Sequence, residues 1–224
     1  MGKFLRFVGI ILMGLTAALT LLSGIGTTCV SFDAAQYEGM EAIAQYQWLY
    51  IFYVLAAVAI GIMGIRATVS LVRGKEKSYR DALIALGLGI VTGGVHIATS
   101  RVLRGSSMPL DFIVYATVLT LIIFLLFGIP KLRKLVDFER ESDNVSGAAG
   151  GMAAIVAGML FLSVQMWAGP THIFAGVNLA DAFHTAMMIS GVAFVLLGIG
   201  LLGRAALKDT LPSPASTEVA RLST

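Results

Sequence analysis

The sequence predicts an all-α membrane protein, a bundle of six transmembrane helices in three consecutive hairpins with both termini in the cytoplasm. Of the 224 residues, 57% are apolar and only 13% are charged, whereas soluble domains carry about 25% charged residues. Six uncharged stretches of at least nineteen residues separate the charges. A helix needs about 20 apolar residues to cross a hydrocarbon layer of about 30 Å, so each stretch is long enough to span a bilayer.

The expected spans follow from the positions of the charged residues that bound these stretches. They cover residues 7–28, 47–67, 82–100, 112–130, 149–168 and 184–203. Residues 1–207 therefore form one transmembrane domain, and residues 208–224 are expected to be a short flexible cytoplasmic tail. The charged segment Lys131 to Asp143 is expected to be a solvated connector. The first span also resembles a signal peptide, but its apolar run is long and no A-x-A site follows, so we expect it to be retained.

The basic residues predict the orientation. With the amino terminus in the cytoplasm, every one of the sixteen Lys and Arg residues except Arg101 and Arg104 lies on the cytoplasmic side, which is the positive-inside bias. The net charge of +3 is thereby explained by topology, and no nucleic-acid partner is expected. The expected location is the cell membrane, a prokaryotic cytoplasmic membrane. The expected partners are the lipid bilayer and either further copies of the chain or subunits of a membrane complex.

Aromatic side chains mark the outer end of the second span. They are Tyr46, Trp48, Tyr50, Phe52 and Tyr53. Aromatic rings with a polar group favour the headgroup level of a bilayer, so we expect these rings to lie at the interface.

The ends of the spans suggest an internal repeat of helical hairpins. Odd-numbered spans end in glycine-containing segments that lead to Cys29, His96 and His172, and even-numbered spans end in glycine followed by Arg66, by Pro130 and Lys131, or by Arg204. The intervals between these points are similar, as in membrane folds built from repeats. Because the chain contains 25 glycines, such matches also arise by chance, and both interpretations stay open.

The repeat would place Cys29, His96 and His172 at equivalent outer positions of three parallel helices. One thiolate and two imidazoles suit copper or zinc. Alternatively, His96 and His172 could ligate a haem iron from opposite sides. The simpler interpretation gives each side chain an ordinary polar partner near the interface. As the only cysteine, Cys29 cannot form a disulfide within the chain.

Three polar residues of the last hairpin are candidate substrate-binding residues. Asp181 precedes His184 by three residues, so its carboxylate could hold the imidazole on one helical turn, or it could simply cap the last helix. Gln165 is the polar side chain within a span that packing explains least well.

Arg101 and Arg104 are the remaining candidates for substrate binding. As the only basic residues on the outer side, they could form an anion-facing mouth. A local pair of Arg104 with Asp111, or contact with a lipid phosphate, explains them equally well. In either case we expect at least one of the two arginines to pair with Asp111 or a phosphate.

Hydroxyl and small residues inside the spans predict helix contacts. The hydroxyls of Thr16, Thr20, Thr117 and Thr120 are expected to bond to neighbouring helices or to their own backbone. The pairs Gly89 with Gly93 and Ala154 with Gly158 are spaced to allow two helices to approach closely.

The sequence contains no nucleotide-binding, hydrolase or metalloprotease motif, and no charged residue lies near the middle of a span. Ion-coupled transporters generally need such a charge, so active transport is disfavoured. We therefore expect a non-enzymatic protein, either a pathway for a small solute or ion or an accessory subunit of a membrane complex. The alternative is a membrane redox or metal protein that uses Cys29, His96 and His172.

Overall fold

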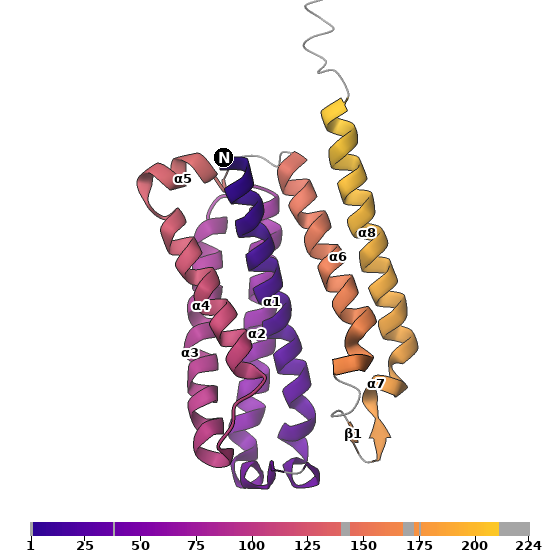
Figure 1. The fold of residues 1–224 in the computed structure, drawn as a ribbon. Helices are drawn as coiled ribbons and strands as arrows, with labels where there is room; N and C mark the ends of the chain where they lie inside the picture. The colour runs from indigo at the N-terminus through magenta and orange to yellow at the C-terminus, as the bar shows by residue number, and fades with distance from the viewer. Residues whose placement is uncertain (1, 38, 140–143, 168–172, 175, 211–224) are drawn as a thin grey trace, which may run out of the picture.

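In a computed structural model the chain forms a bundle of long helices that run roughly along one axis (Figure 1). The structure describes residues 2–37, 39–139, 144–167, 173–174 and 176–210. Within these residues, six helices are long and apolar enough to cross a membrane. The all-α bundle with six candidate spans is therefore confirmed.

The long helices are α1 (Gly2–Phe32), α2 (Gln47–Val72), α3 (Ser78–Arg104), α4 (Leu110–Phe127), α6 (Asn144–Trp167) and α8 (His184–Thr210). The connectors hold short elements, namely η1 (Ala34–Gln36), η2 (Glu41–Tyr46), α5 (Pro130–Val136), β1 (Ile173–Phe174), β2 (Val177–Asn178) and α7 (Leu179–Ala182). The strands β1 and β2 pair antiparallel, with Ile173 opposite Asn178. None of these short elements was predicted from the sequence.

Helices α1 to α4 form one group, α6 lies against α1, and α8 lies on the outer side of α6 (Figure 1). We call the end of the bundle that holds α5 and the start of α1 the α5 end, and the opposite end, with η1 and η2, the η2 end. The basic connector between α2 and α3 lies at the α5 end, whereas Arg101 and Arg104 lie at the η2 end. This segregation agrees with the expected topology. Which side of a membrane each end faces stays a prediction, and so does the hairpin repeat.

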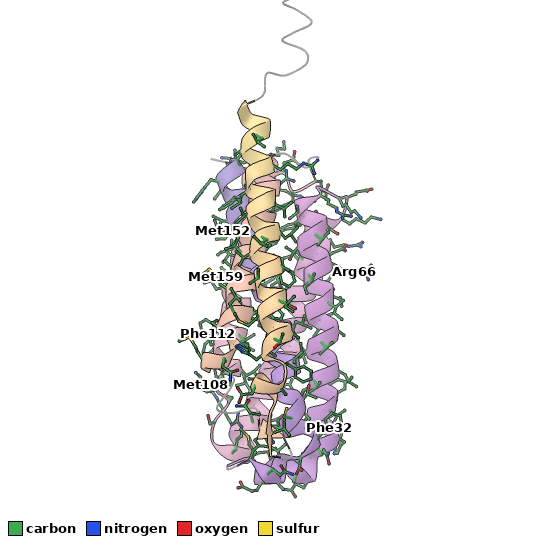
Figure 2. The ribbon with its side chains drawn as sticks, turned by 90° about the vertical axis from the view of Figure 1, so that its right-hand side faces the viewer. Phe32, Arg66, Met108, Phe112, Met152 and Met159 are labelled. Carbon is green, nitrogen blue, oxygen red and sulfur yellow. The ribbon has the colours of Figure 1, made fainter. Side chains whose placement is uncertain are left out.

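The outer surface of the helices is apolar, as a membrane-embedded surface should be (Figure 2). Phe32, Met108, Phe112 and Met159 are all exposed at this surface. Arg66 is also exposed, but it lies within the last two turns of α2, close to the α5 end. A long arginine side chain at that position can reach the headgroups.

Glycine allows the helices of each hairpin to approach closely. Between α6 and α8, a Cβ atom on Gly158 would lie 2.7 Å from the carbonyl oxygen of Gly191, and one on Gly198 would lie 2.5 Å from that of Gly151. Between α3 and α4, a Cβ atom on Gly93 would lie 2.5 Å from Val114 Cγ2. Of the predicted Gly89 and Gly93 pair, Gly93 makes a close contact, whereas a Cβ atom on Gly89 would lie at an ordinary 3.5 Å from Thr117 Cγ2. In the last hairpin the contacts follow a seven-residue spacing of glycines on both helices.

The connector after α4 corrects one expectation. The segment from Lys131 to Asp143 was predicted to be solvated, but Val136 and Phe138 are buried. The Phe138 ring stacks on Phe124 of α4, with centroids 5.5 Å apart and planes 6° apart. The side chains of Lys131, Arg133 and Lys134 are exposed. An interpretation based on charge alone therefore missed the burial of the two apolar residues.

Candidate functional site

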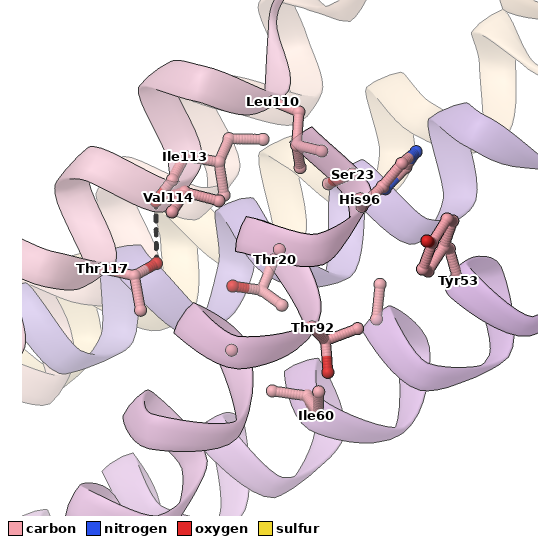
Figure 3. A pocket seen from close by; sticks show the side chains of 13 residues that line it. Thr20, Ser23, Tyr53, Ile60, Thr92, His96, Leu110, Ile113, Val114 and Thr117 are labelled. Carbon is pink, nitrogen blue, oxygen red and sulfur yellow. Dashed lines mark hydrogen bonds between the residues drawn. The ribbon is translucent and has the colours of Figure 1, made fainter. Parts of the chain in front are cut away.

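A small cavity lies among α1, α2, α3 and α4, within the candidate spans (Figure 3). Its polar lining consists of Thr20, Ser23, Tyr53, Thr92, His96 and Thr117. About 30 Å³ is open to the centres of water molecules. Since one water needs about 10–15 Å³ by this measure, the cavity has room for about two.

The hydroxyls of the cavity are oriented by their own helices. Thr20 donates to the carbonyl oxygen of Thr16 at 2.8 Å, and Thr117 donates to that of Ile113 at 2.7 Å. Each hydroxyl has one hydrogen, so the oxygens of Thr20 and Thr117 remain able to accept a hydrogen bond. A molecule that donates hydrogen bonds therefore suits this part of the lining.

His96 is buried at the side of the cavity nearest the η2 end. Its ring stacks on Tyr53, with centroids 4.3 Å apart and planes 16° apart, and meets the Tyr50 ring edge-on at 5.2 Å. Tyr50 and Tyr53 are only 2% and 3% exposed, whereas Trp48 is 69% exposed. Tyr50 and Tyr53 therefore face the interior of the bundle rather than its outer surface, and whether this segment lies at the headgroup level stays a prediction. They lie three residues apart, on the face of α2 that points into the bundle.

The tyrosine hydroxyls tie α2 to α3. Tyr50 Oη lies 2.9 Å from Ser100 Oγ, and Tyr53 Oη lies 2.9 Å from Thr99 Oγ1. Because Thr99 donates to the carbonyl oxygen of Val95, Tyr53 must be the donor in its own pair. These bonds fix the two rings that hold His96, so the imidazole is positioned by packing rather than by an ion pair.

A second hydroxyl contact lies one helical turn beyond the cavity, toward the α5 end. Thr16 of α1 and Thr120 of α4 are both buried, and their Oγ1 atoms lie 2.9 Å apart. Thr120 donates to the carbonyl oxygen of Ala116, so Thr16 donates to Thr120. The expectation that these hydroxyls bond across helices or to the backbone is confirmed.

Arg101 and Arg104 lie in the last turn of α3, at the η2 end of the bundle. Arg101 donates to Asp111 Oδ1 at 2.7 Å and to Ser107 Oγ at 2.9 Å, and Ser107 donates to Asp111 Oδ2 at 2.6 Å. The prediction that one of the two arginines pairs with Asp111 is confirmed, and the pair is made by Arg101 rather than Arg104. Arg104, in the last turn of α3, donates to the carbonyl oxygen of Met108 at 3.3 Å.

The predicted metal ligands have different neighbours where they are described. Cys29 forms a side-chain hydrogen bond with Tyr37 in the connector after α1, and burial, then Cys29 and Asp33, raise the pKa of Tyr37 to about 12. His96 packs on tyrosines, and His172 lies outside the described residues. In the described part of the chain, no three His, Cys, Asp or Glu side chains form a group able to hold a metal. The three-ligand site and the haem site therefore stay predictions.

The polar residues of the last hairpin form a contact that was not predicted. The Gln165 side-chain amide of α6 donates to Asp181 Oδ1 of α7. Asn178 Oδ1 accepts hydrogen bonds from the backbone N–H groups of Ala180 and Asp181, at 3.0 and 3.4 Å, and thus caps α7. His184 is exposed at the first position of α8. Sixteen residues separate Gln165 from Asp181, so no local pattern could have indicated this pair.

The cavity lining offers hydroxyl and imidazole groups but no carboxylate, ammonium or guanidinium group. Such a site suits neutral hydrogen-bonding molecules, whereas an ion would lose its hydration without gaining a countercharge. No protein-family model matches the chain, no curated protein matches it, and no solved structure matches its fold.

Proposed function

We propose that α1 to α4 form a membrane pathway for uncharged, water-sized molecules that donate hydrogen bonds, the class that contains water and ammonia. The observation that carries this proposal is the hydroxyl-lined cavity in the middle of four helices, of which each is long and apolar enough to cross a membrane. Six of the thirteen lining residues are polar and the other seven are Ala, Ile, Gly, Leu or Val, so the six polar side chains are where a solute in this cavity finds hydrogen bonds that lipid cannot offer.

The size of the cavity limits the solute. With about 30 Å³ open to the centres of water molecules, the cavity holds about two waters and no molecule of the size of a sugar or an amino acid. The acceptor oxygens of Thr20 and Thr117 point to a solute that carries hydrogen atoms on nitrogen or oxygen.

The charge of the surroundings limits the solute further. None of the lining side chains is a carboxylate, so a cation finds no countercharge in the cavity. Arg104 in the last turn of α3 adds positive charge at the η2 end, the side of the cavity on which His96 lies. Cations are therefore disfavoured twice, by desolvation and by repulsion.

The test is the permeability of proteoliposomes, measured by stopped-flow light scattering for water and by an internal pH dye for ammonia. The informative variant is Gly89→Ala, because a Cβ atom there enters the cavity 3.5 Å from Thr117 Cγ2 and 3.8 Å from Ile60 Cγ2, without a clash. Its matched control is Gly87→Ala on the same helix, where a Cβ atom meets nothing within 4 Å.

We expect wild-type protein and Gly87→Ala to raise permeability equally above that of protein-free liposomes, and Gly89→Ala to remove most of the increase. Equal permeability of wild-type and protein-free liposomes to both solutes would overturn the proposal. An undiminished flux through Gly89→Ala would assign the pathway to another part of the protein.

A further inference from the structure

Two arginines of α2 lie on the face of the helix that points away from the bundle. Arg66 and Arg73 are seven residues apart, close to two helical turns, so they share one face about 10 Å apart along the axis. Both are exposed, and Figure 2 shows Arg66 at the outer side of the bundle. The opposite face of α2 at this end is buried and consists of Gly64, Ala67, Thr68 and Leu71. The two guanidinium groups therefore face the surroundings of the protein.

The surroundings of Arg66 on this face are apolar. Ile62, Met63 and Val69 lie three or four residues from Arg66 and are all exposed. Arg66 precedes Val72, the last residue of α2, by six residues, or about 9 Å, and lies within a candidate membrane span. A guanidinium group stays charged and is costly to place in hydrocarbon, so this side chain extends toward the headgroups at the α5 end.

The described part of the chain supplies no countercharge to the two arginines. Helix α2 contains no Asp or Glu. The ion pairs at Asp81 and at Asp111 are made by other arginines. Among the described residues, the side chains of Arg66 and Arg73 form no hydrogen bond and no ion pair. Two cations on a lipid-facing surface therefore find their countercharge in the membrane.

The spacing of the polar groups suits one phosphate. Ser70 lies between the two arginines on the same face, four residues after Arg66 and three residues before Arg73. A guanidinium group binds phosphate through two parallel hydrogen bonds, and a serine hydroxyl supplies one further donor. Long side chains that leave the helix about 10 Å apart can converge on a single phosphate between them.

We propose that Arg66, Ser70 and Arg73 bind the phosphate of an anionic phospholipid, whose headgroup lies toward the α5 end and whose acyl chains run along Ile62 and Met63. Charge complementarity favours an anionic lipid such as phosphatidylglycerol. In phosphatidylcholine a quaternary ammonium group lies next to the phosphate and opposes binding to two guanidinium groups. The site lies on the side of α2 opposite the cavity, so it does not depend on the proposed pathway.

The test is native mass spectrometry of the full chain released from detergent micelles. Dioleoylphosphatidylglycerol or dioleoylphosphatidylcholine is added at matched concentrations, and the apparent affinity of the first bound lipid is measured. We expect wild-type protein to hold one phosphatidylglycerol about tenfold more tightly than phosphatidylcholine. Arg66→Gln and Arg73→Gln should each lower the affinity for phosphatidylglycerol about tenfold, because each removes charge-assisted hydrogen bonds.

Two further variants separate a phosphate site from general attraction by basic residues. The double variant Lys131→Gln with Lys134→Gln removes two exposed charges of α5, at the same end of the bundle, and should change the affinity less than twofold. Arg66→Lys keeps the charge but loses the planar fork, so its loss should be intermediate. If Arg66→Gln does not purify, Arg66→Lys and Arg73→Gln decide.

Three results would overturn the proposal. The first is an unchanged affinity for phosphatidylglycerol in the folded arginine variants. The second is an equal loss in the α5 double variant, which would show that only net charge matters. The third is displacement of phosphatidylglycerol by inorganic phosphate added to the micelles, which would assign the arginines to a free anion. Equal water and ammonia permeability of wild-type and protein-free liposomes would overturn the pathway and leave this lipid site unaffected.

Discussion

The imidazole ring of His96 lies parallel to the phenol ring of Tyr53, with centroids 4.3 Å apart. The Tyr53 hydroxyl is in turn bonded to Thr99 of the helix that carries His96, so the two helices hold each other by a ring contact and a hydrogen bond. A histidine within an apolar span is thereby accommodated without a metal or an ion pair in the described contacts. Its nitrogen atoms remain the only basic nitrogens in the lining of the cavity.

Replacement of His96 should separate the packing of the ring from its polarity. His96→Ala removes a buried ring and should lower the free energy of unfolding by about 2–4 kcal/mol. His96→Phe keeps a flat ring against Tyr53 and should lose less than half of that amount. Titration of the purified protein with SDS in mixed micelles measures both. If the Phe variant is as unstable as the Ala variant, a polar contact of the imidazole matters more than its stacking.

The hydrogen bond between Thr16 and Thr120 should show a measurable coupling. Thr16→Val and Thr120→Val retain the shape of the side chains and remove the hydroxyls. A double-mutant cycle on unfolding free energies should give a coupling of about 0.6 kcal/mol, and no more than about 1.7 kcal/mol, the range found for hydrogen bonds between membrane helices. Strict additivity of the two single changes would contradict the cross-helix bond at 2.9 Å.

The carboxylates of Asp111, in the first turn of α4, and Asp81, in the first turn of α3, should contribute differently to the free energy of unfolding. Asp111 is buried and receives hydrogen bonds from Arg101 and Ser107, so Asp111→Asn should lower the unfolding free energy by about 1–3 kcal/mol. Asp81 pairs with Arg80 while both side chains are exposed, so the control Asp81→Asn should cost less than about 0.5 kcal/mol. Thermal unfolding in detergent compares the two, and equal losses would refute the ranking.

The contact between α6 and α8 should depend on single glycines. Gly158→Ala places a methyl group 2.7 Å from the carbonyl oxygen of Gly191, so the helices must separate and the midpoint of thermal unfolding should fall by several degrees. Gly200→Ala lies on α8 where a Cβ atom meets nothing within 4 Å, and it should leave the midpoint unchanged or raise it slightly. The reverse order would show that the two helices do not pack through Gly158.

The sequence predicted the six candidate spans because a helix in lipid must be long, apolar and nearly free of charge, and these properties can be counted. It did not predict which faces of the helices meet. Tyr50 and Tyr53 have the composition of interface anchors, and only their three-residue spacing indicated a common interior face. Phe138 lies among charged residues in the sequence, and its burial comes from packing against α1, α3 and α4.

Among the candidate site residues, the local relationships were the predictable ones. Asp111 was expected to pair with one of the two arginines across the turn between α3 and α4, and it pairs with Arg101, ten residues away, rather than with Arg104. The pairing of Gln165 with Asp181 and the stacking of His96 on Tyr53 join distant parts of the sequence, where only the assembled fold brings the partners together. The expected partners, further copies of the chain or subunits of a membrane complex, stay a prediction.

The account depends on a polar cavity that reaches the middle of a membrane-embedded bundle, and two neighbouring residues of α3 test it most directly. Thr92 lines the cavity, whereas Val91 is 66% exposed on the outer, apolar surface. In lipid nanodiscs with Cys29→Ser, hydrogen peroxide, an uncharged hydrogen-bond donor close to water in size, should oxidise Thr92→Cys at least ten times faster than Val91→Cys, because hydrogen peroxide enters the cavity whereas Val91→Cys faces hydrocarbon. The rate is measured as the loss of labelling by a fluorescent maleimide after denaturation. Equal rates at the two positions, or an unreactive Thr92→Cys, would contradict the account.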